Sequence, residues 1–271
     1  MKLIEVEDGV RINTLELGAG DPILLLHGWS LSMEVWDRQI RVLAEAGHRV
    51  IAMDTRGHGH SDAPLSGYDI DQLAADAFSV LTAHGVHRAH VVGWSLGGMI
   101  ALRMAHRAPE RVSAVVMVAS NGVAGARQPG FPFGAPPDGA LAAILAAEHL
   151  DRVSLRRNAV GDPFGTPPDP GTLDWLHRIS LQTPSWAAMN CMKTLLCTNQ
   201  THILDTLVVP VSQIVGRSDP AMSSRGARWV QERLASSLTE LDCGHYPMLE
   251  RPDEFDNALL RALAMVERIA T

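Results

Sequence analysis

Four short runs of nearly unbroken apolar residues constrain the fold of this 271-residue chain more than any other feature. They read PILLLH at 22–27, RVIAMD at 49–54, AHVVGW at 89–94 and RVSAVVMVAS at 111–120. A strand covered on both faces has this pattern, whereas a strand with one wet face alternates apolar and polar residues. The runs therefore predict buried strands of a largely parallel sheet.

Segments with the apolar spacing of amphipathic helices separate these runs. They cover 34–46, then 69–84 with Asp69 as its N-terminal cap, and 95–108, which Pro109 ends. Strands that alternate with helices predict parallel βαβ units, with helices on both faces of the sheet. The fold class is therefore α/β.

The two ends of the chain extend this pattern. At the N-terminus, two alternating stretches around EDGV predict a hairpin, and after residue 208 the strand–helix rhythm resumes. The predicted strands are 2–7, 11–17, 209–216 and 238–242, and the predicted helices are 222–235 and 252–269.

Between 121 and 205 the sheet rhythm stops. Residues 121–139 and 161–171 are rich in Gly and Pro and predict loops, whereas 140–157 and 172–200 predict helices, the second being one helix or two. We therefore expect a core domain of residues 1–120 and 206–271, with a helical cap inserted at 121–205.

Composition limits which binding partners and which cellular compartment are expected for this chain. The net charge is −7 and no Lys/Arg block occurs, so a nucleic-acid partner is not expected. The N-terminus lacks the apolar centre of a signal peptide, and no stretch is apolar enough to cross a bilayer. Three cysteines fit a reducing compartment, so we expect a cytoplasmic protein. The sequence favours free thiols at Cys191 and Cys197 but also leaves open a disulfide between them.

One serine stands where a predicted strand meets a predicted helix. Gly93, Ser95 and Gly97 form the pattern G-x-S-x-G, in the strand–turn–helix context that this pattern requires. A tight turn there lifts the hydroxyl out of the sheet, and side chains two residues before and after would collide with the backbone. Ser95 is therefore a candidate nucleophile.

A serine hydroxyl needs a base and an acid that orients the base. His245 follows the last predicted strand, and Asp219 follows strand 209–216, so Ser95, Asp219 and His245 stand in the chain order of nucleophile, acid and base. Asp219 also suits a cap for helix 222–235. Asp242, at the end of its strand, is the alternative acid.

Acyl transfer also needs donors for an oxyanion. Backbone N–H groups of Leu96 and Trp29 are the candidates, and a substrate pocket is expected beside Trp94, Trp186 and Met189. His27 suits a structural role in its turn.

The pair His58-x-His60 in DTRGHGHSD has no third ligand at suitable spacing, so we expect no metal. Asp54, Arg56 and Asp62 are instead expected to tie this loop together.

Taken together, the motifs LLHGW, DTRGHGHSD, VVGWSLGG, VGRSDP and CGHYPMLERPDEF resemble those of the α/β-hydrolase superfamily, over about 20–120 and 209–265. The chain is similar to aryl esterases also called cofactor-free haloperoxidases or perhydrolases, and to the pimeloyl-carrier-protein methyl esterase of biotin synthesis. The perhydrolases carry Phe and Met beside the serine, where this chain has Trp94 and Leu96.

The resemblance implies an α/β-hydrolase fold and a serine hydrolase without a cofactor, acting on a small ester or lactone through an acyl-enzyme. Perhydrolysis, C–C bond hydrolysis or a slow-turnover ligand receptor would use the same residues. The sequence leaves open whether the chain forms a homo-oligomer.

Overall fold

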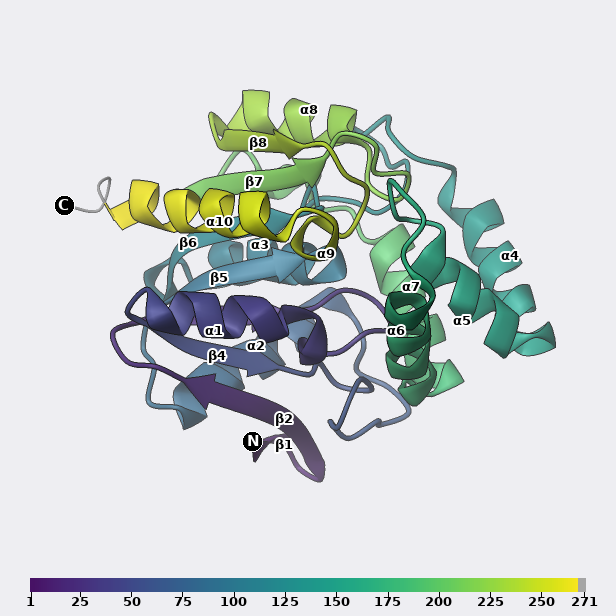
Figure 1. The fold of residues 1–271 in the computed structure, drawn as a ribbon, viewed down its shortest axis with the longest axis horizontal. Helices are drawn as coiled ribbons and strands as arrows, with labels where there is room; N and C mark the ends of the chain where they lie inside the picture. The colour runs from purple at the N-terminus through teal and green to yellow at the C-terminus, as the bar shows by residue number, and fades with distance from the viewer. Residues whose placement is uncertain (268–271) are drawn as a thin grey trace.

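The computed structural model describes residues 1–267. Within them, eight strands form one sheet in the order β1-β2-β4-β3-β5-β6-β7-β8 (Figure 1). The strands are β1 Lys2–Glu7, β2 Val10–Leu17, β3 Asp21–Leu26, β4 His48–Met53, β5 Ala89–Trp94, β6 Val112–Val118, β7 Val211–Gly216 and β8 Ser237–Leu241. The β1–β2 and β2–β4 pairs are antiparallel, and the remaining pairs are parallel.

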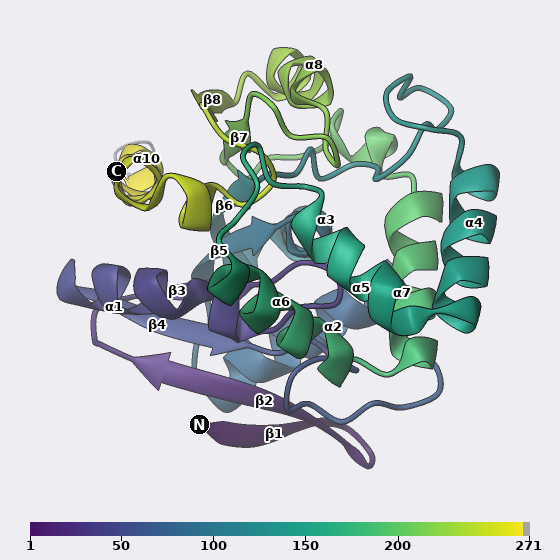
Figure 2. The same ribbon diagram turned by 45° about the vertical axis from the view of Figure 1, so that its right-hand side comes forward.

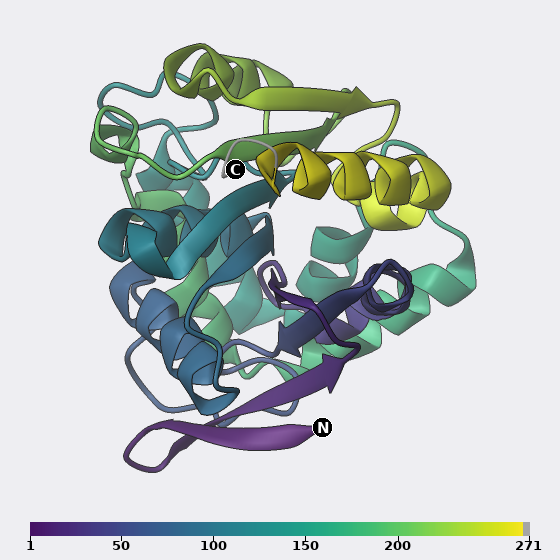
Figure 3. The ribbon, with the colours of Figure 1, turned by 90° about the vertical axis from the view of Figure 1, so that its left-hand side faces the viewer.

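Helices cover both faces of this sheet (Figure 3). Helices α2 Ile70–Ala83, α3 Leu96–Arg107 and α8 Ser224–Leu234 lie on one face, and α1 Asp37–Glu45 and α10 Pro252–Glu267 lie on the other. Successive residues of β3 serve the two layers in turn: Leu24 and Leu26 pack with α2 and α3, and Ile23 and Leu25 pack with α1 and α10. This is why the strands read as continuous apolar runs.

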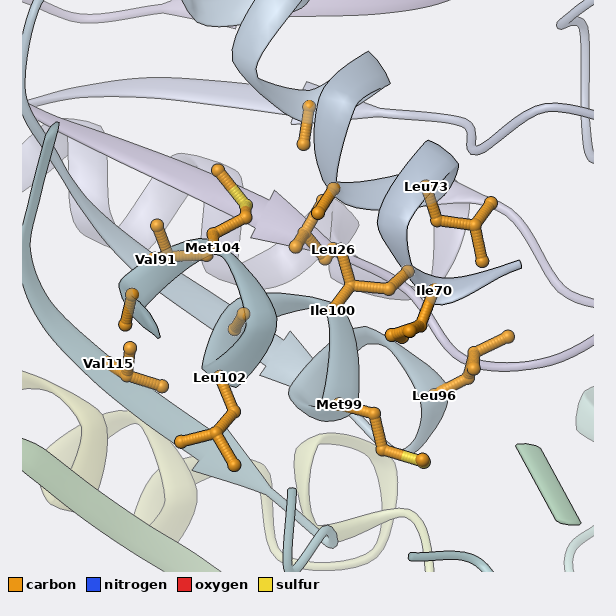
Figure 4. Packing of buried hydrophobic residues seen from close by; sticks show 14 of the residues in the cluster. Leu26, Ile70, Leu73, Val91, Leu96, Met99, Ile100, Leu102, Met104 and Val115 are labelled. Carbon is orange, nitrogen blue, oxygen red and sulfur yellow. The ribbon is translucent and has the colours of Figure 1, made fainter. Parts of the chain in front are cut away.

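Figure 4 shows the α3 side of the core, packed around the helix that begins directly after Ser95. There, Met99, Ile100 and Met104 of α3 lie in one cluster with Val91 of β5 and Val115 of β6. The dense packing of α3 against two central strands holds the start of this helix rigidly in place.

Four helices lie between β6 and β7 in the chain: α4 Pro137–Leu150, α5 Arg152–Gly161, α6 Pro170–Gln182 and α7 Ser185–Cys197. We call them the helical cap. They stand beyond the carboxyl ends of the parallel strands, to the right in Figure 1 and in front in Figure 2. Cys191 and Met192 of α7 belong to the main core cluster, so the cap packs onto that core. Its status as a separate domain stays a prediction.

Two helix predictions need correction, and one helix was not predicted. The predicted helix 140–157 is two helices, because the Asp151 side chain accepts a hydrogen bond from the Ser154 N–H and caps α5. The predicted 34–46 helix begins as a 3₁₀ turn, Met33–Trp36, before α1. A short helix, α9 Pro247–Glu250, was not predicted. Residues 268 and 269, the predicted end of the last helix, lie outside the described residues.

The thiols of Cys191, Cys197 and Cys243 are all free, so the disulfide left open above does not form. Among the described residues, none of the helices combines the length and the apolar character that crossing a membrane requires.

Candidate active site

Ser95 is the single residue between β5 and α3, and its backbone is strained. Its φ of 54° and ψ of −115° lie where non-glycine residues are rarely found. The Ser95 N–H donates to Val118 O at 2.9 Å, and the Ser120 hydroxyl donates to Ser95 O at 2.8 Å. Both peptide groups of the turn are thus held by β6 and the residues that follow it.

The glycines around Ser95 make this turn possible. A Cβ at Gly93 would lie 2.1 Å from Gly97 O, and a Cβ at Gly97 would lie 2.4 Å from Leu26 O. Both obstacles are backbone atoms, which no side-chain rotation can move. Glycine is therefore required two residues before and after the serine, as the sequence predicts.

His245 lies in the loop after β8 and is held on three sides. Its Nδ1–H donates to Asp219 Oδ2 at 2.7 Å, its backbone N–H donates to Pro163 O at 2.8 Å, and its carbonyl accepts from Trp94 Nε1 at 2.8 Å. An ionised carboxylate only accepts hydrogen bonds, so Asp219 keeps the proton on Nδ1. This leaves Nε2 as the basic nitrogen.

Asp219 is itself fixed by backbone donors. Its Oδ1 accepts from Ala221 N–H at 2.8 Å and Met222 N–H at 2.9 Å. These bonds organise a turn before α8, whereas the cap residue of α8 is Ser223. The suggestion that Asp219 caps this helix is therefore wrong.

Asp242, the alternative acid, is exposed and lies beside Arg251. The Asp242 side chain is 77% exposed, and its Oδ2 lies 3.9 Å from Nη2 of Arg251. The structure therefore pairs His245 with Asp219.

Ser95 and His245 line the same cavity, which has a volume of about 230 Å³. The other lining residues are largely apolar: Trp29, Trp94, Gly125, Ile144, Ala159, Pro163, Met192, Leu195, Leu196, Ala221, Met222 and Tyr246. Larger hollows elsewhere contain neither of these two residues. The cavity thus joins a hydroxyl and an imidazole in an apolar chamber between the sheet and the helical cap.

Of the three residues predicted to line the substrate pocket, one lines the cavity and two do not. Trp94 lines the cavity, with its ring centroid 5.3 Å from that of His245. Trp186 and Met189 do not line it: Trp186 is 41% exposed, and its indole N–H donates to Ala63 O at 3.3 Å.

The face of α7 that does line the cavity is formed by Met192, Leu195 and Leu196, which were not among the predicted pocket residues. Their spacing of three and four residues along a helix could have identified this face.

The oxyanion candidates lie at the edge of this cavity. Leu96 is the first residue of α3, where backbone N–H groups have no partner within the helix. Trp29 lies in the loop after β3 and lines the cavity, and its indole N–H donates to Ala188 O at 2.8 Å. Their roles as oxyanion donors stay a prediction.

Two buried histidines support the same loop. His27 Nδ1–H donates to Gly28 O at 2.7 Å, and His27 Nε2 accepts from Thr55 N–H at 2.9 Å, so the structural role predicted for His27 is confirmed. Burial lowers the pKa of His27 and lowers that of His58 to about 3. Both imidazoles are neutral supports near pH 7.

The ring of His58 is used for loop structure. His58 Nε2 accepts from Ser30 N–H at 3.1 Å, and Nδ1 lies 2.9 Å from Arg56 O. Both nitrogens are therefore engaged by the backbone, while His60 is exposed.

Of the three charged residues expected to tie this loop together, Asp54 does so by accepting from His60 N–H at 3.0 Å, whereas Arg56 and Asp62 pair with residues outside the loop. Asp54 Oδ1 accepts from Met33 N–H at 2.8 Å, Arg56 Nε donates to Asp76 at 2.6 Å, and Asp62 Oδ2 pairs with Arg11 Nε at 2.9 Å.

Comparison with known proteins shows the family to which this chain belongs. A family model described as the alpha/beta hydrolase fold matches residues 21–252. The chain belongs to the α/β-hydrolase fold family. The resemblance drawn from its sequence motifs is thereby confirmed.

Relatives of this α/β hydrolase include enzymes of two kinds. It is 33% identical to the pimeloyl-[acyl-carrier protein] methyl ester esterase of Nitrosomonas europaea, over 88% of this chain and 94% of the relative. It is 32% identical to the non-heme chloroperoxidase of Streptomyces lividans, over 88% and 90%. Among solved structures, the esterase EaEST of Exiguobacterium antarcticum has a TM-score of 0.92 and 26% identity, over 98% of both chains.

Proposed function

We propose that this α/β hydrolase is a serine esterase or lactonase that works through an acyl-enzyme. The observation that carries the proposal is the 2.7 Å bond between His245 Nδ1 and Asp219 Oδ2, at a cavity that His245 shares with the strained Ser95. Such a pair activates a hydroxyl, because the carboxylate orients the imidazole and stabilises its charged form.

The reaction follows from these positions. Ser95 Oγ attacks the substrate carbonyl carbon while His245 Nε2 takes the hydroxyl proton, and the Trp29 and Leu96 N–H groups bind the oxyanion. The tetrahedral intermediate then expels the alcohol, which takes the proton from His245. Water, deprotonated by the same imidazole, attacks the acyl-enzyme and releases the acid.

The lining of the cavity supports small, uncharged substrates. His245 is its sole titratable side chain apart from the buried phenol of Tyr246, and burial raises the pKa of that phenol far above neutral pH. A substrate carboxylate or ammonium in this apolar chamber would lose its hydration without gaining an opposite charge. Esters and lactones with short, neutral acyl groups therefore fit best.

The test is a panel of p-nitrophenyl esters from acetate to decanoate, with lactones of graded ring substituents, assayed on the parent and on Ser95→Ala. We expect turnover of short neutral members by the parent and its loss by at least about 10³-fold in Ser95→Ala, with an unchanged circular dichroism spectrum. Residual activity within a few-fold of the parent would refute the proposal. So would tight binding of substrates without release of product, the behaviour of a receptor.

Perhydrolysis is the second candidate, and the 32% identity to a non-heme chloroperoxidase favours it. In this reaction, hydrogen peroxide instead of water would attack the Ser95 acyl-enzyme and release a peracid. Assays with an acetate ester and hydrogen peroxide, read by bromide oxidation, separate the two reactions. Peracid formation that outpaces ester hydrolysis would favour perhydrolysis.

A further inference from the structure

A buried arginine of the helical cap lies against the predicted oxyanion loop. Arg156, in α5, is fully buried, and its Cζ lies 5.1 Å from the centroid of the Trp29 ring. At this distance a guanidinium is attracted to the face of an indole. The side chain of Trp29 is thus held by a charge from the cap, while its backbone N–H is the predicted oxyanion donor.

The guanidinium is itself held in one orientation. Its Nε and Nη2 donate to the two carboxylate oxygens of Glu148 in α4, each at 2.8 Å, and its Nη1 donates to Ser180 O in α6 at 2.9 Å. Bidentate pairing with a carboxylate fixes both the position and the plane of a guanidinium. Three cap helices therefore meet at this one side chain.

A second connection reaches the next loop residue. The Ser180 hydroxyl lies 2.9 Å from that of Ser30, whose backbone has a φ of 59°. The Trp29 indole is anchored to α7 by its 2.8 Å bond to Ala188 O. Cap helices thus hold two successive residues of the loop, one of them in the left-handed region.

Stability alone is a weak reason for such a buried ion pair. Desolvating a carboxylate and a guanidinium costs much of what their attraction returns, and apolar residues of similar volume usually pack as well. A fork of fixed geometry, in contrast, specifies where its neighbours sit. Neither Arg156 nor Glu148 lines the cavity, so neither touches the reacting atoms.

We propose that Arg156, oriented by Glu148, is a positioning residue that holds the Trp29 N–H at the oxyanion site, an inference that rests on the proposed serine-hydrolase function. It makes the helical cap part of the machinery for transition-state binding as well as a cover for substrate. Loss of the fork would leave substrate binding intact and displace one oxyanion donor.

The test compares Arg156→Lys, which keeps the charge but loses the bidentate fork, with Arg157→Met. Arg157 is the next residue of α5, is partly exposed and pairs with Asp174 on the surface, so it serves as the control. A Glu148→Gln, Arg156→Met double variant removes both charges, in case Arg156→Lys does not fold. The readouts are kcat and KM for p-nitrophenyl acetate and the dissociation constant of phenylboronic acid, whose adduct with a serine mimics the oxyanion. A fluorophosphonate titre normalises each sample for competent enzyme.

Removing an oxyanion donor lowers kcat by about 10²–10³-fold, so a displaced donor is expected to lower it by at least about tenfold. We expect this loss in both Arg156 variants, with KM within twofold of the parent and boronate binding weakened by a similar factor. Arg157→Met should match the parent in all three values.

Two results would overturn the inference: kcat within twofold of the parent in the Arg156 variants, or a fall in kcat without weaker boronate binding. These differ from failure of the proposed function, in which Ser95→Ala keeps its turnover and the parent does not bind the boronate.

Discussion

Ser95 shows how one residue depends on the absence of side chains around it. Its φ of 54° is maintained because Gly93 and Gly97 let three backbone segments approach one another. A motif of five letters can therefore be interpreted sterically, since each glycine marks a place where backbone meets backbone.

Replacing Gly93 with Ala tests this close approach. The added Cβ would lie 2.1 Å from Gly97 O, so we expect a fall of at least about 2 kcal/mol in the free energy of unfolding, together with loss of esterase activity. The control is Gly139→Ala in the first turn of α4, where a Cβ meets nothing within 4 Å; its stability should stay level or rise by up to about 1 kcal/mol. Urea unfolding measures both, and equal effects in the two variants would contradict the steric argument.

The choice of acid is also decided residue by residue. Asp219→Asn should lower kcat by on the order of 10⁴-fold, because an amide at this position favours the wrong imidazole tautomer. Asp242→Asn, at a carboxylate that is 77% exposed beside Arg251, should stay within twofold of the parent. The measurement is kcat for p-nitrophenyl acetate at steady state. A larger fall in kcat in Asp242→Asn than in Asp219→Asn would identify Asp242 as the acid.

At the level of secondary-structure elements, the helical cap decides the shape of the pocket. Helix α7 turns Met192, Leu195 and Leu196 toward the cavity, while Trp186 lies 41% exposed near its N-terminus. In α4, Glu148 is the sole buried residue and pairs with Arg156, while Leu141 and Ile144 are partly buried and pack against the main core cluster. The amino-acid composition of the helical cap does not tell which side of each helix faces the cavity.

Met192→Ala and Trp186→Ala test the orientation of α7. Shortening Met192 enlarges the cavity, so we expect the preferred p-nitrophenyl ester to become longer by about two carbons, measured as kcat/KM along the acyl series. Trp186→Ala should leave this profile unchanged. A shifted profile in Trp186→Ala, or none in Met192→Ala, would mean that the substrate lies against another face of the helix.

At the scale of the whole molecule, stability depends on groups buried where the loops meet the sheet. His27 and His58 lie between the loop after β3 and the loop after β4, and both accept hydrogen bonds from backbone N–H groups as neutral imidazoles. Protonation of either ring would break such a bond and place a charge in the buried interior.

The pH dependence of folding follows from these pKa values. The pKa of His58 is lowered to about 3 by burial, whereas an unfolded histidine titrates near 6.5, so the unfolded state binds more protons as the pH falls. The stability that a neutral His58 contributes is therefore present above about pH 6.5 and lost toward pH 3.

From pH 7 to pH 5, His58 alone should lower the free energy of unfolding by about 2 kcal/mol. Urea titrations at the two pH values measure this change. His58→Gln keeps an acceptor near the Nε2 position and should show a correspondingly smaller loss. Identical losses in the parent and in His58→Gln would exclude His58 as the source.

The sequence by itself determined the order of strands and helices along the chain, the family, and the candidate serine, histidine and acids. These features rest on local causes: strands buried on both faces need unbroken apolar runs, and a strained turn needs glycines on either side. Only the tertiary structure decided between Asp219 and Asp242, turned Met192 inward and Trp186 outward, and brought Arg156 against Trp29. Each of these depends on how segments far apart in the chain pack together, and the packing of one helix face against another leaves no local pattern in the sequence.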